Sequence, residues 1–125
     1  MSKNIGIKWR PEPEEKDYPA AESYLGLIYG ETTVMTIVNE LRDCPLKQFK
    51  AKDIFRASGL SLLGVSNSHV EKDRKKIEEG KQISPILLVR DENIGRVVIA
   101  DGYHRLCAVY SFAEDESIPC KIAQR

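Results

Sequence analysis

The residues best suited to chemistry form one short segment, Asp101-Gly102-Tyr103-His104-Arg105, which follows an apolar run and precedes a run with helical spacing. A helix that begins after Gly102 exposes backbone N–H groups without partners inside the helix, and these groups attract anions. Glycine also lets a ligand approach the backbone closely. His104 can donate a hydrogen bond or move a proton near neutral pH, and Arg105 can bind a phosphate through two N–H groups. The segment therefore predicts an anion site, with Asp101 and His104 as candidate catalytic groups.

The charge of this segment favours the same interpretation. Basic residues in the first turn of a helix oppose the helix dipole, so His104 and Arg105 stand there at a cost that a bound anion would offset. A structural alternative stays open, in which Asp101 only caps the helix and Arg105 only pairs with Asp101. The Walker phosphate-loop signature, G-x-x-x-x-G-K-[ST], does not occur in the sequence.

The elements that must position this segment alternate between helix and strand. The apolar run over 86–89 has no polar interruptions, which is typical of a strand covered on both faces. A short polar turn joins it to the apolar run directly before the segment and predicts a hairpin. From residue 68 onward we expect a helix over 68–79 capped by Ser68, a strand over 85–90, a strand over 96–100, a helix over 103–112 and a strand over 118–122.

The first half of the chain predicts mostly helix. Apolar residues at helical spacing indicate helices over 20–29 and 32–42, which form a helical hairpin that docks on the rest of the domain. Phe49, Ile54 and Phe55 lie among polar residues and indicate a short strand or an irregular edge segment. Residues 58–67 are rich in Ser, Gly and Leu and indicate a loop.

Length and charge limit the classes of protein that the chain can represent. The 125 residues predict a single domain, with a helical N-terminal extension over 1–45 and an α+β core over 46–125. The 19 basic and 19 acidic residues balance, which disfavours tight unspecific binding to nucleic acid. The positive charge is concentrated over residues 46–90, which contain ten basic and five acidic residues, so a local anion site remains allowed.

Other features of the sequence predict a cytoplasmic protein without a membrane partner. There is no apolar run of membrane-spanning length, and the first ten residues lack the apolar centre of a signal peptide. Three scattered cysteines do not form a disulfide framework, and two distant histidines do not indicate a zinc site.

The segment from about Phe49 to Ala123 resembles the ParB/sulfiredoxin-like superfamily, especially its small stand-alone ParB-like proteins. The resemblance rests on the runs "KKIEEG", "ISPILLVRD", "VVIADGYHRLCAVY" and "SIPCKIA". Sulfiredoxin has Gly-Cys-His-Arg at the turn where this chain has Gly-Tyr-His-Arg. The resemblance implies an α+β fold with a small mixed sheet flanked by helices. It also implies that the turn and the helix start hold the phosphates of a nucleoside di- or triphosphate.

The resemblance further implies which residues contact the nucleotide. His104 and Arg105 would contact the phosphates, with Gly102 and Tyr103 offering backbone groups. The preceding helix would turn its own polar and basic side chains toward the same pocket, and in this chain they are His69, Lys72 and Lys76.

Two departures from the superfamily narrow the activity. Tyr103 stands where sulfiredoxin has its nucleophilic cysteine, which excludes sulfinic acid reduction. Cys107 lies between apolar neighbours and is expected to be a buried small hydrophobic residue. We also expect no complete chromosome-segregation protein, because no DNA-reading or dimerisation domain follows Ala123.

Asp101 instead resembles the Asp-Gly turn of small-molecule kinases in the superfamily. A carboxylate beside phosphates repels them unless a cation lies between, so Asp101 indicates Mg²⁺ at an active site. A kinase also needs a base for its acceptor, and Asp53, Glu71 and Asp73 are the candidates.

Three functions stay open. The first is a nucleotide-binding protein with a regulatory or slow phosphoryl-transfer role, whose protein partner binds the N-terminal hairpin. The second is a small-molecule kinase or NTPase of the same superfamily. The third is a DNA-associated ParB-like protein, which the neutral charge disfavours.

Overall fold

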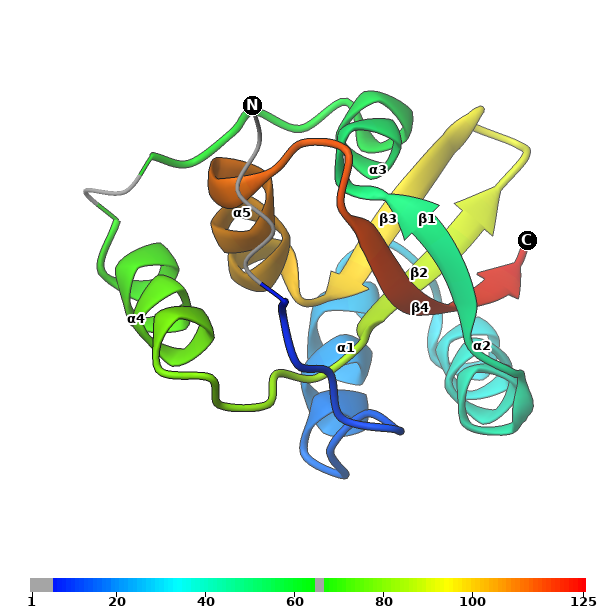
Figure 1. Ribbon diagram of the computed structural model, residues 1–125. Helices are drawn as coiled ribbons and strands as arrows, with labels where there is room; N and C mark the ends of the chain where they lie inside the picture. The colour runs from blue at the N-terminus through cyan, green and yellow to red at the C-terminus, as the bar shows by residue number, and fades with distance from the viewer. Residues whose placement is uncertain (1–5, 65–66) are drawn as a thin grey trace.

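One four-stranded mixed sheet organises the chain (Figure 1), and the computed structural model describes residues 6–64 and 67–125. The strands lie in the order β1-β4-β2-β3. β4 runs parallel to β2 and antiparallel to β1, while β2 and β3 pair antiparallel as the predicted hairpin. Their bounds are Lys47–Lys50 for β1, Ile86–Asp91 for β2, Arg96–Asp101 for β3 and Ser117–Gln124 for β4.

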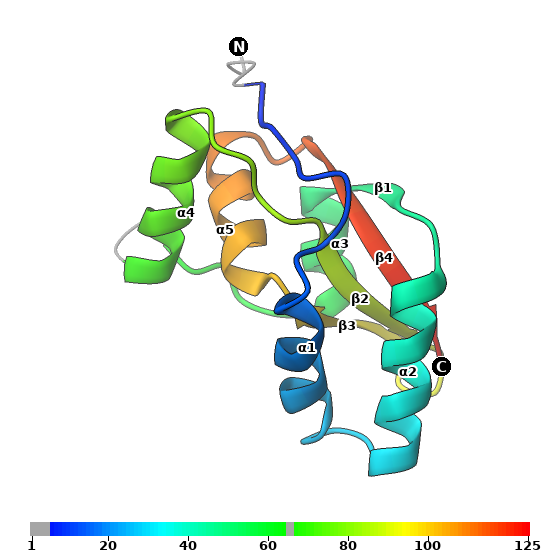
Figure 2. The same ribbon diagram turned by 90° about the horizontal axis from the view of Figure 1, so that it is seen from below.

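Helices cover both faces of this sheet, so the α+β architecture that the sequence predicts is present. Figure 2 shows α1 and α2 on one face and α3 and α5 on the other, with α4 packed on the outer side of α5. In the described part of the chain the helices are α1 (Asp17–Leu25), α2 (Glu31–Asp43), α3 (Ala51–Ser58), α4 (Ser68–Glu78) and α5 (Tyr103–Phe112).

β2 explains why an unbroken apolar run suits the centre of this sheet. Successive side chains of a strand point to opposite faces. Ile86 and Leu88 belong to the hydrophobic cluster under α3, α4 and α5, and Leu87 and Val89 belong to the cluster under α1 and α2. None of the four is more than 2% exposed. The strand therefore holds both layers of helices to the sheet.

The prediction of a strand or irregular edge over Phe49, Ile54 and Phe55 was wrong for two of these residues. Phe49 lies on the edge strand β1, but Ile54 and Phe55 lie on α3. The α3 residues Ala51, Ile54, Phe55 and Ser58 are buried at positions i, i+3, i+4 and i+7, which is the spacing of one helical face. β1 ends at Lys50 and α3 begins at Ala51. The apolar residues of this segment therefore follow the spacing of a strand first and that of a helix afterwards, and neither spacing is clear from the sequence.

The N-terminal helical hairpin docks on the sheet as predicted, and one buried lysine helps to fix it. Lys121 on β4 is 3% exposed. Its Nζ donates a hydrogen bond of 2.9 Å to the carbonyl oxygen of Arg42 and lies 3.4 Å from a carboxylate oxygen of Glu12. A cation is favourable at the C-terminal end of a helix, where carbonyl groups lack partners. Lys121 therefore joins β4 to the end of α2 and to the segment before α1.

Among the boundaries that differ from the prediction are the starts of α4 and α1. The predicted cap Ser68 is the first residue of α4, and the Asn67 side chain is the cap that accepts hydrogen bonds from the N–H groups of His69 and Val70. Asp17 begins α1 and Leu25 ends it, so α1 lies earlier than the predicted range of 20–29. Pro19 fits there because the first turn of a helix does not need its N–H group. Over residues 6–64 and 67–125, no helix has the length and apolar character that crossing a membrane requires.

Candidate functional site

The turn between β3 and α5 has the strand–turn–helix geometry that the sequence predicts. β3 ends at Asp101, Gly102 has φ of 107°, and α5 begins at Tyr103. The first hydrogen bond within the helix joins the N–H of Leu106 to the carbonyl of Gly102 at 2.9 Å. The N-cap residue is Gly102, which has no side chain to cap this helix start. The N–H groups of Tyr103, His104 and Arg105 therefore have no acceptor within the helix and can serve as donors for an anion.

The Arg105 side chain lies at this turn and donates hydrogen bonds to three residues in two parts of the chain. Its Nε donates to the carbonyl of Ser84 at 3.0 Å. Its Nη2 donates to the carbonyl of Pro85 at 3.2 Å and to the Asp101 carboxylate at 3.1 Å. Charge-assisted hydrogen bonds of this kind are strong and directional. Arg105 thus joins the segment before β2, the end of β3 and the start of α5.

These bonds bear on the structural alternative left open by the sequence. The pairing of Arg105 with Asp101 is observed, but Asp101 does not cap the helix. The donors of these three hydrogen bonds are Nε and Nη2 of Arg105, and Nη1 donates none of the three. A contact between Arg105 and phosphate therefore stays a prediction.

A polar pocket of about 210 Å³ lies between this turn and α4. It brings together every residue that the resemblance assigned to the nucleotide, from two helices and one turn. Lys16, the residue before α1, also lines this pocket. The lining residues are Lys16, His69, Lys72, Asp73, Lys76, Asp101, Gly102, Tyr103, His104 and Arg105.

Positive charge dominates the rim of this pocket. Lys16 and Lys72 are exposed, and Lys76 is half-buried, so their ammonium groups can reach a ligand from solvent. Lys16 also lies 3.5 Å from a carboxylate oxygen of Glu14, an exposed pair that water screens. The two lining carboxylates are Asp73 and Asp101, and Asp101 is paired with Arg105.

The imidazoles of His69 and His104 lie against each other inside the pocket, with ring centroids 4.9 Å apart. Burial, the neighbouring His69 and Arg105 together lower the pKa of His104 below its usual 6.5, and Asp73 acts in the opposite direction. His104 therefore loses its proton more readily than a free imidazole. A ligand with negative charge near it would reverse that balance, because opposite charge favours the protonated form.

The pKa values of two carboxyl groups of the site, Asp73 and Asp101, are raised. Burial raises the pKa of Asp73, although Arg105, Lys76, His104 and Lys72 all lower it in part. Burial also raises the pKa of Asp101, and the neighbouring Asp17 carboxyl adds to the rise against the effect of Arg105. Both groups hold a proton more readily than a free aspartate, which lessens their repulsion of an anion.

The three candidate bases lie in different places. Asp73 lines the pocket. Glu71 lies 3.7 Å from the guanidinium of Arg74 on the same helix. Asp53 lies on α3 at a separate apolar pocket beside Phe49 and Ile54. Asp73 is thus the candidate base that the fold brings to the turn.

The residues around Asp101 do not by themselves fit a resident magnesium site. The Asp101 carboxylate already bonds to Arg105, whose positive charge competes with a metal ion. Across the part of the chain that the structure describes, no group of three or more His, Cys, Asp or Glu residues could hold a metal ion. A role for Mg²⁺ stays a prediction, and no step below depends on it.

Tyr103 and Cys107, which both lie on α5, make contacts that stabilise the fold. The Tyr103 hydroxyl donates to the carbonyl of Ser61 and so holds the loop after α3 near the helix start. Cys107 is fully buried, and burial raises the pKa of its thiol. A thiol in this environment packs as a small hydrophobic side chain, as the sequence predicts.

Sequence reasoning missed two residues of the site, Lys16 and Asp17. Lys16 precedes α1 and Asp17 begins it, ahead of the range of 20–29 that the sequence predicts for this helix, and both lie beside the turn. The signal that could have found them is the Asp-Tyr-Pro sequence, because acidic residues and proline both favour the first turn of a helix.

Comparisons of the chain with protein-family models, with curated proteins and with solved structures give no match.

Substituting Gly102 tests whether the turn depends on the close approach of Arg105. A Cβ at this position would lie 2.9 Å from Nη2 of Arg105 and 2.9 Å from Cγ1 of Ile86, and the φ of 107° strains any other residue. Gly102→Ala should therefore lower the free energy of unfolding, measured in urea, by about 1–3 kcal/mol from backbone strain plus a further loss from the clash. Gly95→Ala is the matched control, because Gly95 has φ of 66° and open space around it. Equal losses in the two variants would contradict the close-approach account.

Proposed function

We propose that this chain is a ParB-like nucleotide-binding protein of the ParB/sulfiredoxin-like fold, and that it holds nucleotide phosphates at the start of α5. The observation that carries the proposal is the convergence of Lys16, Lys72, Lys76 and His104 on the uncapped helix start. The mixed sheet and the turn from β3 into α5 support the finer assignment of the fold.

The chemistry of the pocket matches a phosphate chain better than a single carboxylate. Backbone N–H groups at a helix start bind one phosphate group, as in other phosphate sites. The lysines of α4 and the lysine before α1 line the pocket from separate parts of the chain, so they can neutralise further phosphates. Lysine acts at such sites as a point charge that does not demand one geometry.

The balance of groups favours binding over rapid chemistry. Asp101 is held by Arg105 and is therefore poorly placed to accept a proton from a substrate. Binding without fast turnover is the behaviour of a regulatory nucleotide protein, and the N-terminal hairpin beside the pocket is where a protein partner would bind. We place the protein in this class.

A small-molecule kinase or NTPase is the second candidate, and one observation favours it. Asp73 lines the pocket, and its raised pKa suits a general base better than an ordinary aspartate. Release of phosphate at a steady rate, lost in Asp73→Asn while nucleotide binding remains, would move the protein into this second class.

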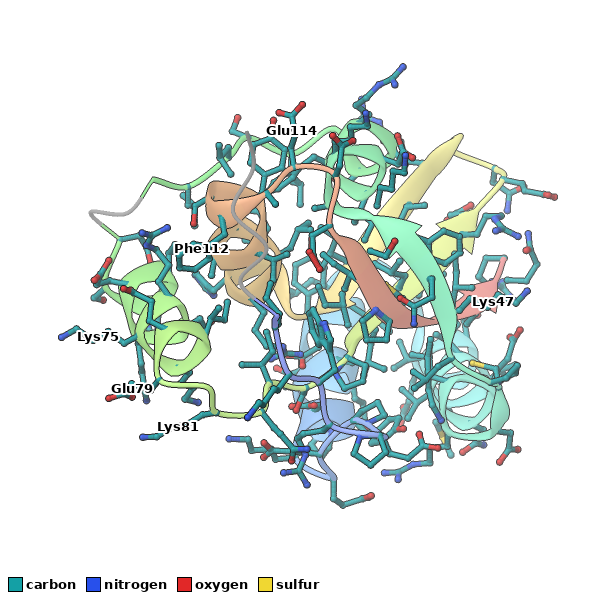
Figure 3. All side chains as sticks on the ribbon, viewed as in Figure 1. Lys47, Lys75, Glu79, Lys81, Phe112 and Glu114 are labelled. Carbon is teal, nitrogen blue, oxygen red and sulfur yellow. The ribbon has the colours of Figure 1, made fainter. Side chains whose placement is uncertain are left out.

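The lysines of α4 provide the direct test of the phosphate site. Lys76→Gln should weaken binding of ATP about tenfold, which corresponds to about 1.4 kcal/mol, because it removes one charged phosphate contact. Isothermal titration calorimetry measures the affinity. Lys75→Gln is the matched control, since Figure 3 shows Lys75 extending away from the body of the molecule on the same helix. An equal loss in both variants would mean that only the general charge of α4 matters.

His104 should make the affinity depend on pH. Its pKa is lowered in the free protein, and bound phosphate would raise it, so binding takes up a proton. Affinity for ATP should therefore rise as the pH falls from 8 towards 6, and the rise should be smaller in His104→Asn. Comparing the two proteins at each pH removes the titration of ATP itself. Parallel pH profiles would show that His104 does not face the phosphates.

A further inference from the structure

A second pocket, of about 420 Å³, lies on the other side of the same turn. It shares Asp101, Gly102, Tyr103 and His104 with the polar pocket of about 210 Å³, so the two pockets meet at the turn. Figure 2 shows why α1 takes part, since α1 lies beside the end of β3 and the start of α5. The residues that line only this second pocket are Ala20, Tyr24, Leu60, Ile99 and Ala100.

The second pocket differs from the first in chemistry. The residues special to it carry no charge, and Tyr24 and Tyr103 add two aromatic rings. Tyr24 and Leu60 are each 43% exposed, although both are large and apolar. Pockets of several hundred Å³ with apolar walls and a few polar groups are typical of sites for organic molecules. A ligand that covers Tyr24 and Leu60 would remove apolar surface from water.

We infer that this second pocket binds the nucleoside part of the ligand whose phosphates occupy the first pocket, with the planar base against Tyr24. The inference rests on the proposed function and adds the position of the base. Because Gly102 and His104 line both pockets, we expect one molecule to occupy both. Every base has a flat face that can stack on an aromatic ring, so Tyr24 favours a nucleotide over a phosphate chain without a ring.

The position of Tyr24 on α1 explains how the N-terminal helices contribute to the site. Ala20 and Tyr24 are four residues apart and therefore lie on one face of α1. Ala21 and Leu25 lie on the adjoining face and are fully buried against the sheet. The rigid packing of that face fixes the direction of Tyr24. α1 lies outside the segment 49–123 that resembles the superfamily, so this base surface belongs to the chain's own N-terminal extension.

The test compares nucleotides with a phosphate chain that has no base. Inorganic tripolyphosphate carries at least as much negative charge as ATP, so charge alone cannot make a nucleotide bind more tightly. Calorimetry on the full chain with ATP, CTP, GTP, UTP and tripolyphosphate measures each affinity. We expect at least one nucleotide to bind about tenfold more tightly than tripolyphosphate. Tyr24→Ala should remove that advantage and leave the affinity for tripolyphosphate unchanged.

Two further variants separate stacking from other effects. Tyr24→Phe keeps the ring and should keep the nucleotide's advantage. Met35→Ala is the matched control, because Met35 is an exposed side chain of the hairpin that lines neither pocket of the site. Both variants should fold as the parent does, since the changed atoms are exposed, and circular dichroism checks this.

The possible results distinguish the inference from the proposed function. If tripolyphosphate binds and every nucleotide matches it, or if Tyr24→Ala leaves the advantage of the nucleotide intact, the base lies elsewhere and the inference fails while the phosphate site stands. If neither nucleotides nor tripolyphosphate bind at millimolar concentration, the proposed function fails as well.

Discussion

The guanidinium of Arg105 holds the candidate site in shape. It bonds to the carbonyl oxygens of Ser84 and Pro85 and to the carboxylate of Asp101, at distances from 3.0 to 3.2 Å. These partners lie before β2 and at the end of β3, and Arg105 itself lies in the first turn of α5. Gly102 lies so close to the guanidinium that a Cβ at this position would be 2.9 Å from Nη2 of Arg105, and a residue with a side chain does not fit there. The helix start is therefore fixed before any ligand arrives, and preorganisation of this kind lowers the cost of binding.

The charges around this guanidinium form a more buried set and an exposed set. Arg105 offsets the Asp101 carboxylate, and Asp17 is buried beside it with its own carboxylate bonded to the N–H of Glu14 at 3.0 Å. Lysines from α4 and from the residue before α1 line the pocket, and Lys16 and Lys72 are exposed. The more buried set stabilises the fold, and the exposed set is available to an anion. Arg105 therefore stabilises the fold, and substituting it would disturb the structure as well as any binding. Substitutions of the lysines test ligand binding more directly.

Local patterns in the sequence predicted the elements that carry the turn. The helix expected over 103–112 is α5 at the same bounds, since Asp-Gly ends the strand and the apolar spacing changes at once. β2 was recognisable because burial on both faces demands an unbroken apolar run. α3 was not, because an eight-residue helix directly after a four-residue strand gives neither periodicity room to repeat. Lys16 and Tyr24 were also missed as parts of the site. They are far from residue 101 in sequence, and only the docking of α1 on β3 brings them to it.

A nuclear magnetic resonance titration with ATP tests directly whether the N–H groups at the start of α5 bind phosphate. The amide signals of Tyr103, His104 and Arg105 should move together and to lower field as ATP is added, because each N–H gains or strengthens a hydrogen bond to phosphate. The amide of Gly95, at the far end of β3 in the turn after β2, should stay in place. If the α5 amides keep their positions at millimolar ATP while other signals move, the phosphate lies elsewhere and the account is contradicted.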